Sequence, residues 1–293
     1  MRWIAIAALG WMAGGCSTVQ LERSGSLASY DNLTPSDGLL TKSQVRVSKA
    51  YVLAAKTLRI EPTALTAAAA RVPFTDEQRS LIKNAVSRAM CLALSERFQV
   101  VAATEPADLS VRAVIIHVAP TDAAAAGVSK VASVVPSIVA PGVPIPVPRL
   151  PIGLGSLAVE AEARDPRGSQ KAAMIWARGA NSFTSAPRVS SEGDAYDLAS
   201  AFGDDFGKLL VTAESPFGKV PAAPSLASLK ASLGGAPKEA ACEAFGRAPG
   251  LVGMIGQRVG VPPDWTDKGA PANATHNEST PPVDGQIASA TER

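Results

Sequence analysis

Two stretches of the chain repeat apolar residues at the 3.6-residue period of an α-helix. The first, at 75–98, begins with Thr75 and Gln78 in the spacing of a capping box, and two acidic residues lie in its first turn, where the helix dipole favours them. Its apolar face consists of Ile82, Ala85, Val86, Ala89 and Ala93. The second stretch, at about 194–213, gathers leucines and phenylalanines on one side. This spacing predicts two long helices.

Shorter stretches alternate polar and apolar residues, or are apolar throughout, as strands do. They lie at 56–61, 98–101, 108–118, 157–163 and 172–181. The last two are separated by Asp165-Pro166-Arg167-Gly168, a turn sequence, and therefore predict a hairpin. The order of strands and helices predicts an α+β fold over 56–213, with a mostly antiparallel sheet and helices packed on one face.

The alternation stops in an insert at 119–155, between two of the predicted strands. Residues 131–147 carry no charge but contain four prolines, which exclude a regular membrane-spanning helix. Two interpretations stay open. The insert is an extended Pro-rich loop packed on the protein, or its central part, 128–149, is an apolar lid or a contact for lipid or a protein partner.

The composition changes after residue 213. A Pro-rich linker leads into a C-terminal extension, 214–270, with short helices expected at 226–233 and 238–245. Trp265 is a candidate to dock back on the domain. From 271 to 293 the chain is rich in Ala, Asn, Thr, Pro and Ser, a composition typical of a disordered tail.

The N-terminus has the pattern of a bacterial lipoprotein signal. A basic residue, an apolar run at 3–13 and Gly14-Gly15 precede Cys16, in a near match to a lipobox. The pattern predicts that 1–15 is a signal peptide and that Cys16 carries acyl chains such as palmitate, which anchor the chain stably in a membrane. An ordinary signal with an unrelated cysteine, or an N-terminal membrane anchor, are the alternatives. Residues 16–55 are expected to form a tether followed by an entry segment that leads into the domain.

The residue after Cys16 bears on location. Ser17 stands where an Asp commonly retains lipoproteins in the inner membrane. This favours the outer membrane of a Gram-negative cell over the inner one, with the polypeptide on the periplasmic face.

The remaining cysteines, Cys91 and Cys242, form an even pair in an oxidising compartment, where disulfides persist. A disulfide between them would tie the extension to the domain, and the alternative is that Cys91 is a buried free thiol. The chain has 28 basic and 26 acidic residues, so its charge gives no indication of nucleic-acid binding.

Candidate chemistry is sparse. His117 lies in a predicted strand and His276 in the predicted tail, so the histidines form no metal cluster. Gly153-Leu154-Gly155-Ser156 precedes a strand, whereas a phosphate-binding loop opens a helix. Glu160 and Glu162 lie two apart on one strand face and are ordinary residues if that face meets solvent. The sequence therefore predicts no catalytic residue, no cofactor and no metal.

Several segments together carry a family resemblance. They are Ser24-Gly25-Ser26-Leu27-Ala28-Ser29-Tyr30-Asp31-Asn32-Leu33 after the lipobox, the strand near Leu58, the helix 75–98, Ala107-Asp108-Leu109 and Val159 to Asp165. Over about 16–213 the chain resembles the proteobacterial lipoproteins called domain of unknown function 3313. The resemblance implies a location in the cell envelope and no established activity.

The sequence favours a non-enzymatic lipoprotein that binds an unknown envelope protein or supports envelope assembly. The alternative is an auxiliary lipoprotein subunit of an export or lipid-transport machine, with the apolar insert as its contact. A periplasmic hydrolase is the weakest of the three hypotheses, because neither a nucleophile nor a base is evident.

Overall fold

A mixed β-sheet forms the centre of the protein. The computed structural model describes residues 19–128, 153–181, 185, 188–218 and 225–271. The sheet has eight strands in the order β1-β2-β8-β7-β6-β3-β5, and β4 pairs with β6 beside this path. The strands are β1 (Thr34–Pro35), β2 (Thr41–Val47), β3 (Thr57–Ile60), β4 (Ala64–Leu65), β5 (Gln99–Val100), β6 (Leu109–Ala119), β7 (Ser156–Arg164) and β8 (Gln170–Gly179).

The long strands are antiparallel. Neighbours from β1 through β6 in this order pair antiparallel, whereas β3, β4 and β5 pair parallel with their neighbours. The predicted hairpin is β7–β8. Its turn is closed by Asp165, whose carboxylate accepts the backbone N–H groups of Arg167 at 3.0 Å and Ser169 at 2.8 Å. The predicted α+β class, with a mostly antiparallel sheet, is confirmed.

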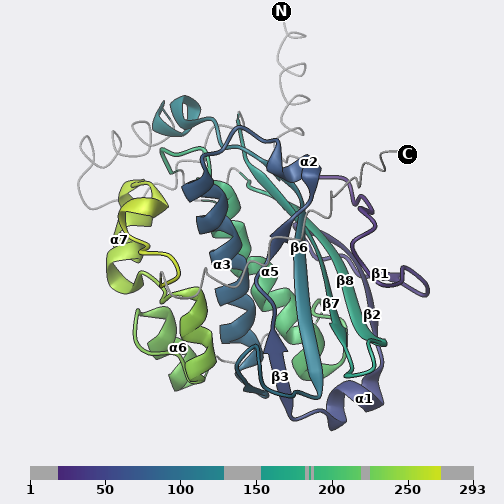
Figure 1. The fold of residues 1–293 in the computed structure, drawn as a ribbon. Coiled ribbons are helices and arrows are strands. Elements are labelled where there is room, and N and C mark those ends of the chain that lie inside the picture. The colour runs from purple at the N-terminus through teal and green to yellow at the C-terminus, as the bar shows by residue number, and fades with distance from the viewer. Residues whose placement is uncertain (1–18, 129–152, 182–184, 186–187, 219–224, 272–293) are drawn as a thin grey trace, which may run out of the picture.

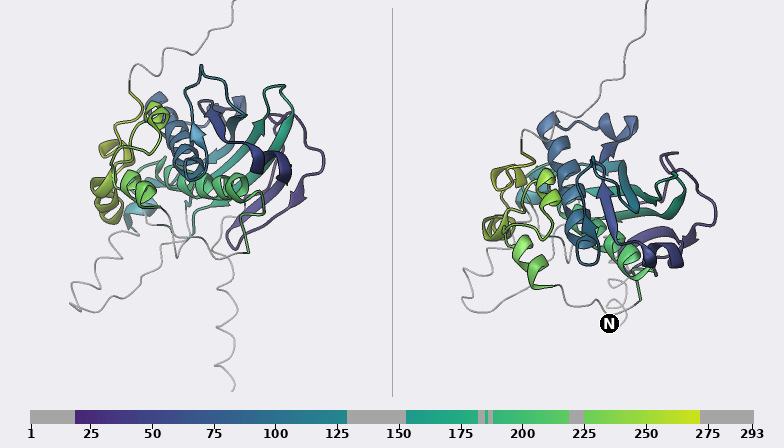
Figure 2. Two further views of the ribbon diagram at one scale, coloured as in Figure 1. Left: turned by 90° about the horizontal axis from the view of Figure 1, so that it is seen from below. Right: turned by 60° about the horizontal axis from the view of Figure 1, so that its bottom comes forward.

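Helices α3 (Asp76–Leu94) and α5 (Gly193–Thr212) lie side by side over one face of the sheet (Figures 1 and 2). The capping box of α3 forms as predicted, with Thr75 Oγ1 accepting the Gln78 N–H at 3.2 Å. Glycines allow the two helices to approach closely, because a Cβ at Gly203 would lie 2.5 Å from that of Ala89. The main core is enclosed between these helices and the sheet. The smaller helices include α1 (Lys49–Ala54), α2 (Ala67–Ala70), α6 (Leu226–Ser232) and α7 (Gly250–Val259), with 3₁₀ turns η1 (Ala240–Phe245) and η2 (Pro263–Trp265).

Part of the expected tether and entry segment belongs to the sheet, since β2 pairs with β8 over seven positions. The sequence does not reveal this strand because two of the residues on its buried side, Thr41 and Ser43, are polar. Apolar residues appear on that side only at Val45 and Val47, near the end of the strand, so the alternation that marks a strand is weak.

The C-terminal extension is fastened to the helices. Cys242 in η1 forms a disulfide with Cys91 in α3, with Cα atoms 5.7 Å apart. The expected docking of Trp265 is wrong, because its side chain is 69% exposed. Asp267, two residues further on, is buried instead.

Candidate functional site

The sheet face opposite the helices is covered by an N-terminal segment, residues 19–33, which we call the strap. Leu27 of the strap is buried against apolar side chains of the three central strands, and Val19, Leu21, Tyr30 and Leu33 pack beside it. Its partners on the sheet are Val114, Ile116, Ala158, Ala173, Ile175 and Ala177. The sheet therefore has apolar cover on both faces.

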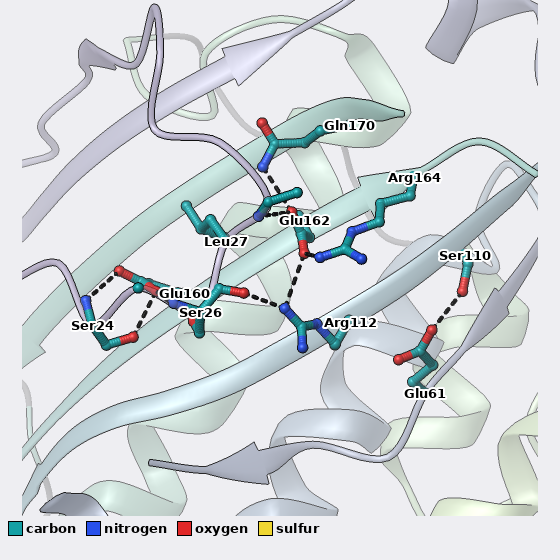
Figure 3. Close-up of polar contacts among 12 residues, drawn as sticks. Ser24, Ser26, Leu27, Glu61, Ser110, Arg112, Glu160, Glu162, Arg164 and Gln170 are labelled. Carbon is teal, nitrogen blue, oxygen red and sulfur yellow. Dashed lines mark hydrogen bonds and ion pairs between the residues drawn. The ribbon is translucent and has the colours of Figure 1, made fainter. Parts of the chain in front are cut away.

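Glu160 of β7 lies under the strap and holds it (Figure 3). Its carboxylate accepts the Ser24 N–H at 2.9 Å, the Ser24 hydroxyl at 2.7 Å and the Ser26 N–H at 3.1 Å. The Ser26 hydroxyl also donates to it, and so does Tyr30 Oη, at 2.7 Å. Charge-assisted bonds of this kind are stronger than neutral ones, so this one carboxylate fixes three strap residues.

Glu162, two residues along the same strand, holds the next part of the strap. It accepts the Ala28 N–H at 2.8 Å and the side-chain amide of Gln170 at 2.7 Å. Arg112 forms an ion pair with it at 3.2 Å and Arg164 forms a second one (Figure 3). Arg112 also donates to the Ser26 carbonyl, so its guanidinium joins the strap to Glu162.

Both carboxylates are ionised in the folded protein. Burial alone would raise the pKa of Glu160, but hydrogen bonds from Ser26, Tyr30 and Ser24 outweigh it and lower that pKa below its usual value. Burial likewise opposes ionisation of Glu162, whose pKa is lowered by Ala28, Arg164 and Gln170. A carboxylate with a lowered pKa and this many donors is a poor proton acceptor, so the pair is suited to holding the strap and not to acid–base catalysis.

A cavity of about 420 Å³ lies next to this pair, at the end of β7. Charged side chains of both signs line it, among them Arg59, Glu61 and Arg164. Ser110 links two of them, since its hydroxyl accepts from Arg59 Nε at 3.3 Å and donates to Glu61 at 2.8 Å. Because the lining charges balance, the cavity has no selective attraction for an anion or a cation.

The family model described as "Protein of unknown function (DUF3313)" matches residues 22–206. The chain belongs to this family. The match includes strap residues 22–33 and both glutamates of β7, whereas the C-terminal extension lies outside it. The DUF3313 family has no assigned function, so membership assigns none to this chain.

Other comparisons add little. No curated protein matches the chain in sequence. Two crystal structures of the PelC dodecamer from Paraburkholderia phytofirmans are similar at 9% sequence identity, with TM-scores of 0.31 and 0.32, covering 56% of this chain and 94% of the PelC chain. A likeness this distant supports no conclusion about the DUF3313 protein.

The structure separates the residues that the sequence singled out. Cys16 and His276 lie outside the described residues, and His117 is exposed on β6. Gly155 donates its N–H to Asp194 of α5 at 2.8 Å. The glycine-rich segment therefore precedes β7 and is hydrogen-bonded to the start of α5, but it does not begin a helix itself. Glu160 and Glu162 do share one strand face, but that face does not meet solvent, because the strap buries them.

A buried ion pair in the helical layer was not foreseen from the sequence. Arg88 of α3 and Asp267 of the extension are both buried and form an ion pair. The Tyr196 hydroxyl donates to Asp267 at 2.6 Å and accepts from Arg88 at 3.1 Å. Burial raises the pKa of Tyr196, which therefore stays protonated as a donor. Spacing along the sequence could not have revealed this network, because it joins residues from three distant segments.

In the described part of the chain, no group of three or more His, Cys, Asp or Glu side chains is placed to hold a metal ion. Within the same residues, no helix has the length and apolar content needed to cross a membrane.

Proposed function

We propose that this DUF3313 protein is an outer-membrane lipoprotein, acylated at Cys16 and facing the periplasm, that acts without catalysis as a binding or envelope-assembly module. The strap is the observation that carries the proposal. Cys16 precedes Val19 by three residues, which span at most about 11 Å when extended. Val19 already packs on the sheet. An acylated Cys16 would therefore hold the domain directly on the bilayer.

The strap gives the anchor a defined place on the domain. Ser24 to Tyr30 are fixed by the two buried carboxylates, so the chain leaves the sheet at one position. A diacylglycerol with an amide-linked acyl chain supplies stable insertion, whereas one acyl chain alone is reversible. Anchor and strap together would set the orientation of the domain at the membrane, which a binding module needs and a freely diffusing enzyme does not.

The buried carboxylates also support a role without catalysis. Glu160 and Glu162 form an acidic pair on one strand, yet their oxygens are already occupied by the strap and by Arg112, Arg164 and Gln170. A catalytic pair needs two different pKa values, one of them raised, and here both pKa values are lowered.

Mass spectrometry of the membrane-extracted protein tests the proposal. We expect a mature N-terminus at Cys16 with the mass of a diacylglycerol and an acyl chain, and recovery in the outer-membrane fraction. An unmodified N-terminus, with release of the protein by osmotic shock, would refute it. The Cys16→Ala variant should lose the modification, and a Ser17→Asp variant should move the protein toward the inner membrane.

The alternative role, as an auxiliary subunit of an export or lipid-transport machine, stays a prediction. It depends on the apolar stretch 128–149, of which only Val128 is described and is exposed. Mild cross-linking followed by pull-down would test it. Partner recovery that is unchanged after deletion of 128–149 would remove its support.

A further inference from the structure

The large apolar residues of helix α7 face away from the body of the protein, whereas such residues normally face inward. Its buried residues are Gly250, Gly253 and Gly256, which recur every three positions and face the body. The opposite side is exposed and apolar. Leu251, Val252, Met254, Ile255 and Val259 are between 47% and 65% exposed. Amphipathic helices of soluble proteins normally bury such residues.

A further exposed apolar residue, Trp265, lies close to α7. It lies in η2, which contacts α7, and its side chain is 69% exposed. We call α7 and Trp265 together the α7 face. An exposed apolar surface of this kind marks a site of interaction with a protein or a membrane.

The α7 face is held firmly on the body. The Val189 N–H donates to the Gly260 carbonyl at 3.0 Å, and Gln257 donates to Asp197 of α5 at 3.1 Å. The segments on both sides of α7 are fixed by the Cys91–Cys242 disulfide and by the buried Asp267. The exposure is therefore a property of the fold and not of a loose end of the chain.

The α7 face lies at the same end of the molecule as the start of the strap. Asp197 belongs to the first turns of α5, and Asp194 beside it binds Gly155, just before β7 begins. The strap advances along β7, because Ser24 contacts Glu160 and Ala28 contacts Glu162. The residues before Ser24 therefore lie toward the beginning of β7, where α5 also begins.

We propose that the α7 face is a second contact with the phospholipid bilayer in which Cys16 is anchored. This inference rests on the proposed lipoprotein function. A short anchor at this end of the domain brings the α7 face near the bilayer. Aliphatic side chains with a tryptophan are the composition of helices that lie in the membrane interface.

Tryptophan fluorescence gives a direct test. Of the four tryptophans, Trp3 and Trp11 belong to the predicted signal peptide, Trp176 is fully buried and Trp265 is exposed. The chain from Ser17 to Arg293, without Cys16, is given an N-terminal histidine tag. It is then held on vesicles of phosphatidylglycerol, brominated phosphatidylcholine and a nickel-chelating lipid. Identical vesicles without bromine serve as reference.

The tag replaces the acyl chains, so the result does not depend on whether Cys16 is acylated in the cell. Interfacial helices lie about 5–10 Å into the headgroup and acyl boundary, within reach of bromine, and we expect about a twofold loss of Trp265 emission. A Trp265→Phe chain should lose that quenching, since Trp176 is buried. Equal emission on both kinds of vesicle would overturn the proposal and leave acylation of Cys16 untouched.

Matched variants assign the contact to the α7 face. Leu251→Ser with Ile255→Ser should abolish most of the quenching. Leu39→Ser with Leu53→Ser makes the same change at two exposed leucines outside α7, 99% and 45% exposed, and should preserve the quenching. Equal effects of the two pairs would refute the proposal. So would a dimer in solution that the α7 pair alone converts to a monomer, because a second copy would then cover α7.

Discussion

The Tyr30 hydroxyl donates a hydrogen bond of 2.7 Å to the carboxylate of Glu160, although the two residues are 130 positions apart in the chain. The same tyrosine ring lies under the guanidinium of Arg23, 5.4 Å from its centre, and its hydroxyl accepts the Gly25 N–H at 2.7 Å. Tyr30 thus folds the strap back on itself above β7. The strap is a small structure built around one buried carboxylate.

Replacing Glu160 by Gln should destabilise the protein. Glutamine keeps the shape but removes the charge, and its NH₂ group is a donor facing the donors of Ser24, Ser26 and Tyr30. Buried hydrogen bonds to charged groups contribute about 1.5–3 kcal/mol each, and part of the network can rearrange, so we expect a loss of about 2–4 kcal/mol. Urea unfolding followed by circular dichroism measures it.

Glu61→Gln is the matched control. Glu61 also accepts a serine hydroxyl, from Ser110 at 2.8 Å, but it is exposed at the rim of the neighbouring cavity. Surface changes of this kind lie within about 0.5 kcal/mol. Equal losses for the two variants would show that the strap contributes nothing special to stability.

The strap should also make stability depend on pH. The folded pKa values of Glu160 and Glu162 are lowered, so the unfolded chain binds more protons in the acid range. Their contribution is present above the unfolded pKa of about 4.3 and is lost as the pH falls below it. We expect the unfolding free energy to drop between about pH 5 and pH 3.

Comparison of the wild type with Glu160→Gln/Glu162→Gln isolates this effect. The double variant should show a flatter dependence in that range, because the titrating carboxylates are gone. Hydrogen exchange of the strap amides from Ser24 to Ala28 should accelerate in the wild type at low pH, beyond the intrinsic pH effect. Parallel stability curves for the two proteins would contradict the assignment.

Features specified by residues close in sequence were predictable. The α3 capping box depends on Thr75 and Gln78, and the β7–β8 hairpin depends on a turn closed by Asp165. In each case the partners lie within a few residues, so the sequence displays the whole interaction.

Features that depend on distant residues were not predictable. The spacing of Glu160 and Glu162 correctly placed them on one strand face, but nothing nearby reveals that a strap more than 130 residues upstream covers that face. For the same reason the sequence suggested that Trp265 docks on the domain and did not single out Asp267. A tryptophan is normally the better candidate for burial, but here the aspartate is buried because Arg88, 179 positions away, neutralises it.

Loss of the Cys91–Cys242 disulfide should cost stability mainly through the unfolded state. The two residues are 151 positions apart, and closing a loop of that length removes unfolded-chain entropy equivalent to about 5 kcal/mol at most. The Cys91→Ala/Cys242→Ala variant should therefore unfold at a lower urea concentration. Its free energy of unfolding should be about 2–5 kcal/mol lower than that of the wild type. A reducing agent should bring the wild type toward the variant and leave the variant unchanged. A response of both proteins to reduction would mean that the effect does not come from this bond.

The buried pair of Arg88 and Asp267 should behave differently when one or both partners are removed. Arg88→Met leaves the Asp267 carboxylate buried with only the Tyr196 hydroxyl and local backbone donors, and such an uncompensated charge costs about 3–5 kcal/mol. Arg88→Met/Asp267→Leu removes both charges and should recover much of that loss, because apolar residues often replace a buried ion pair at little cost. Urea unfolding of the two single variants and the double variant completes the cycle. A double variant as unstable as the sum of the two single variants would show that Arg88 and Asp267 are not coupled.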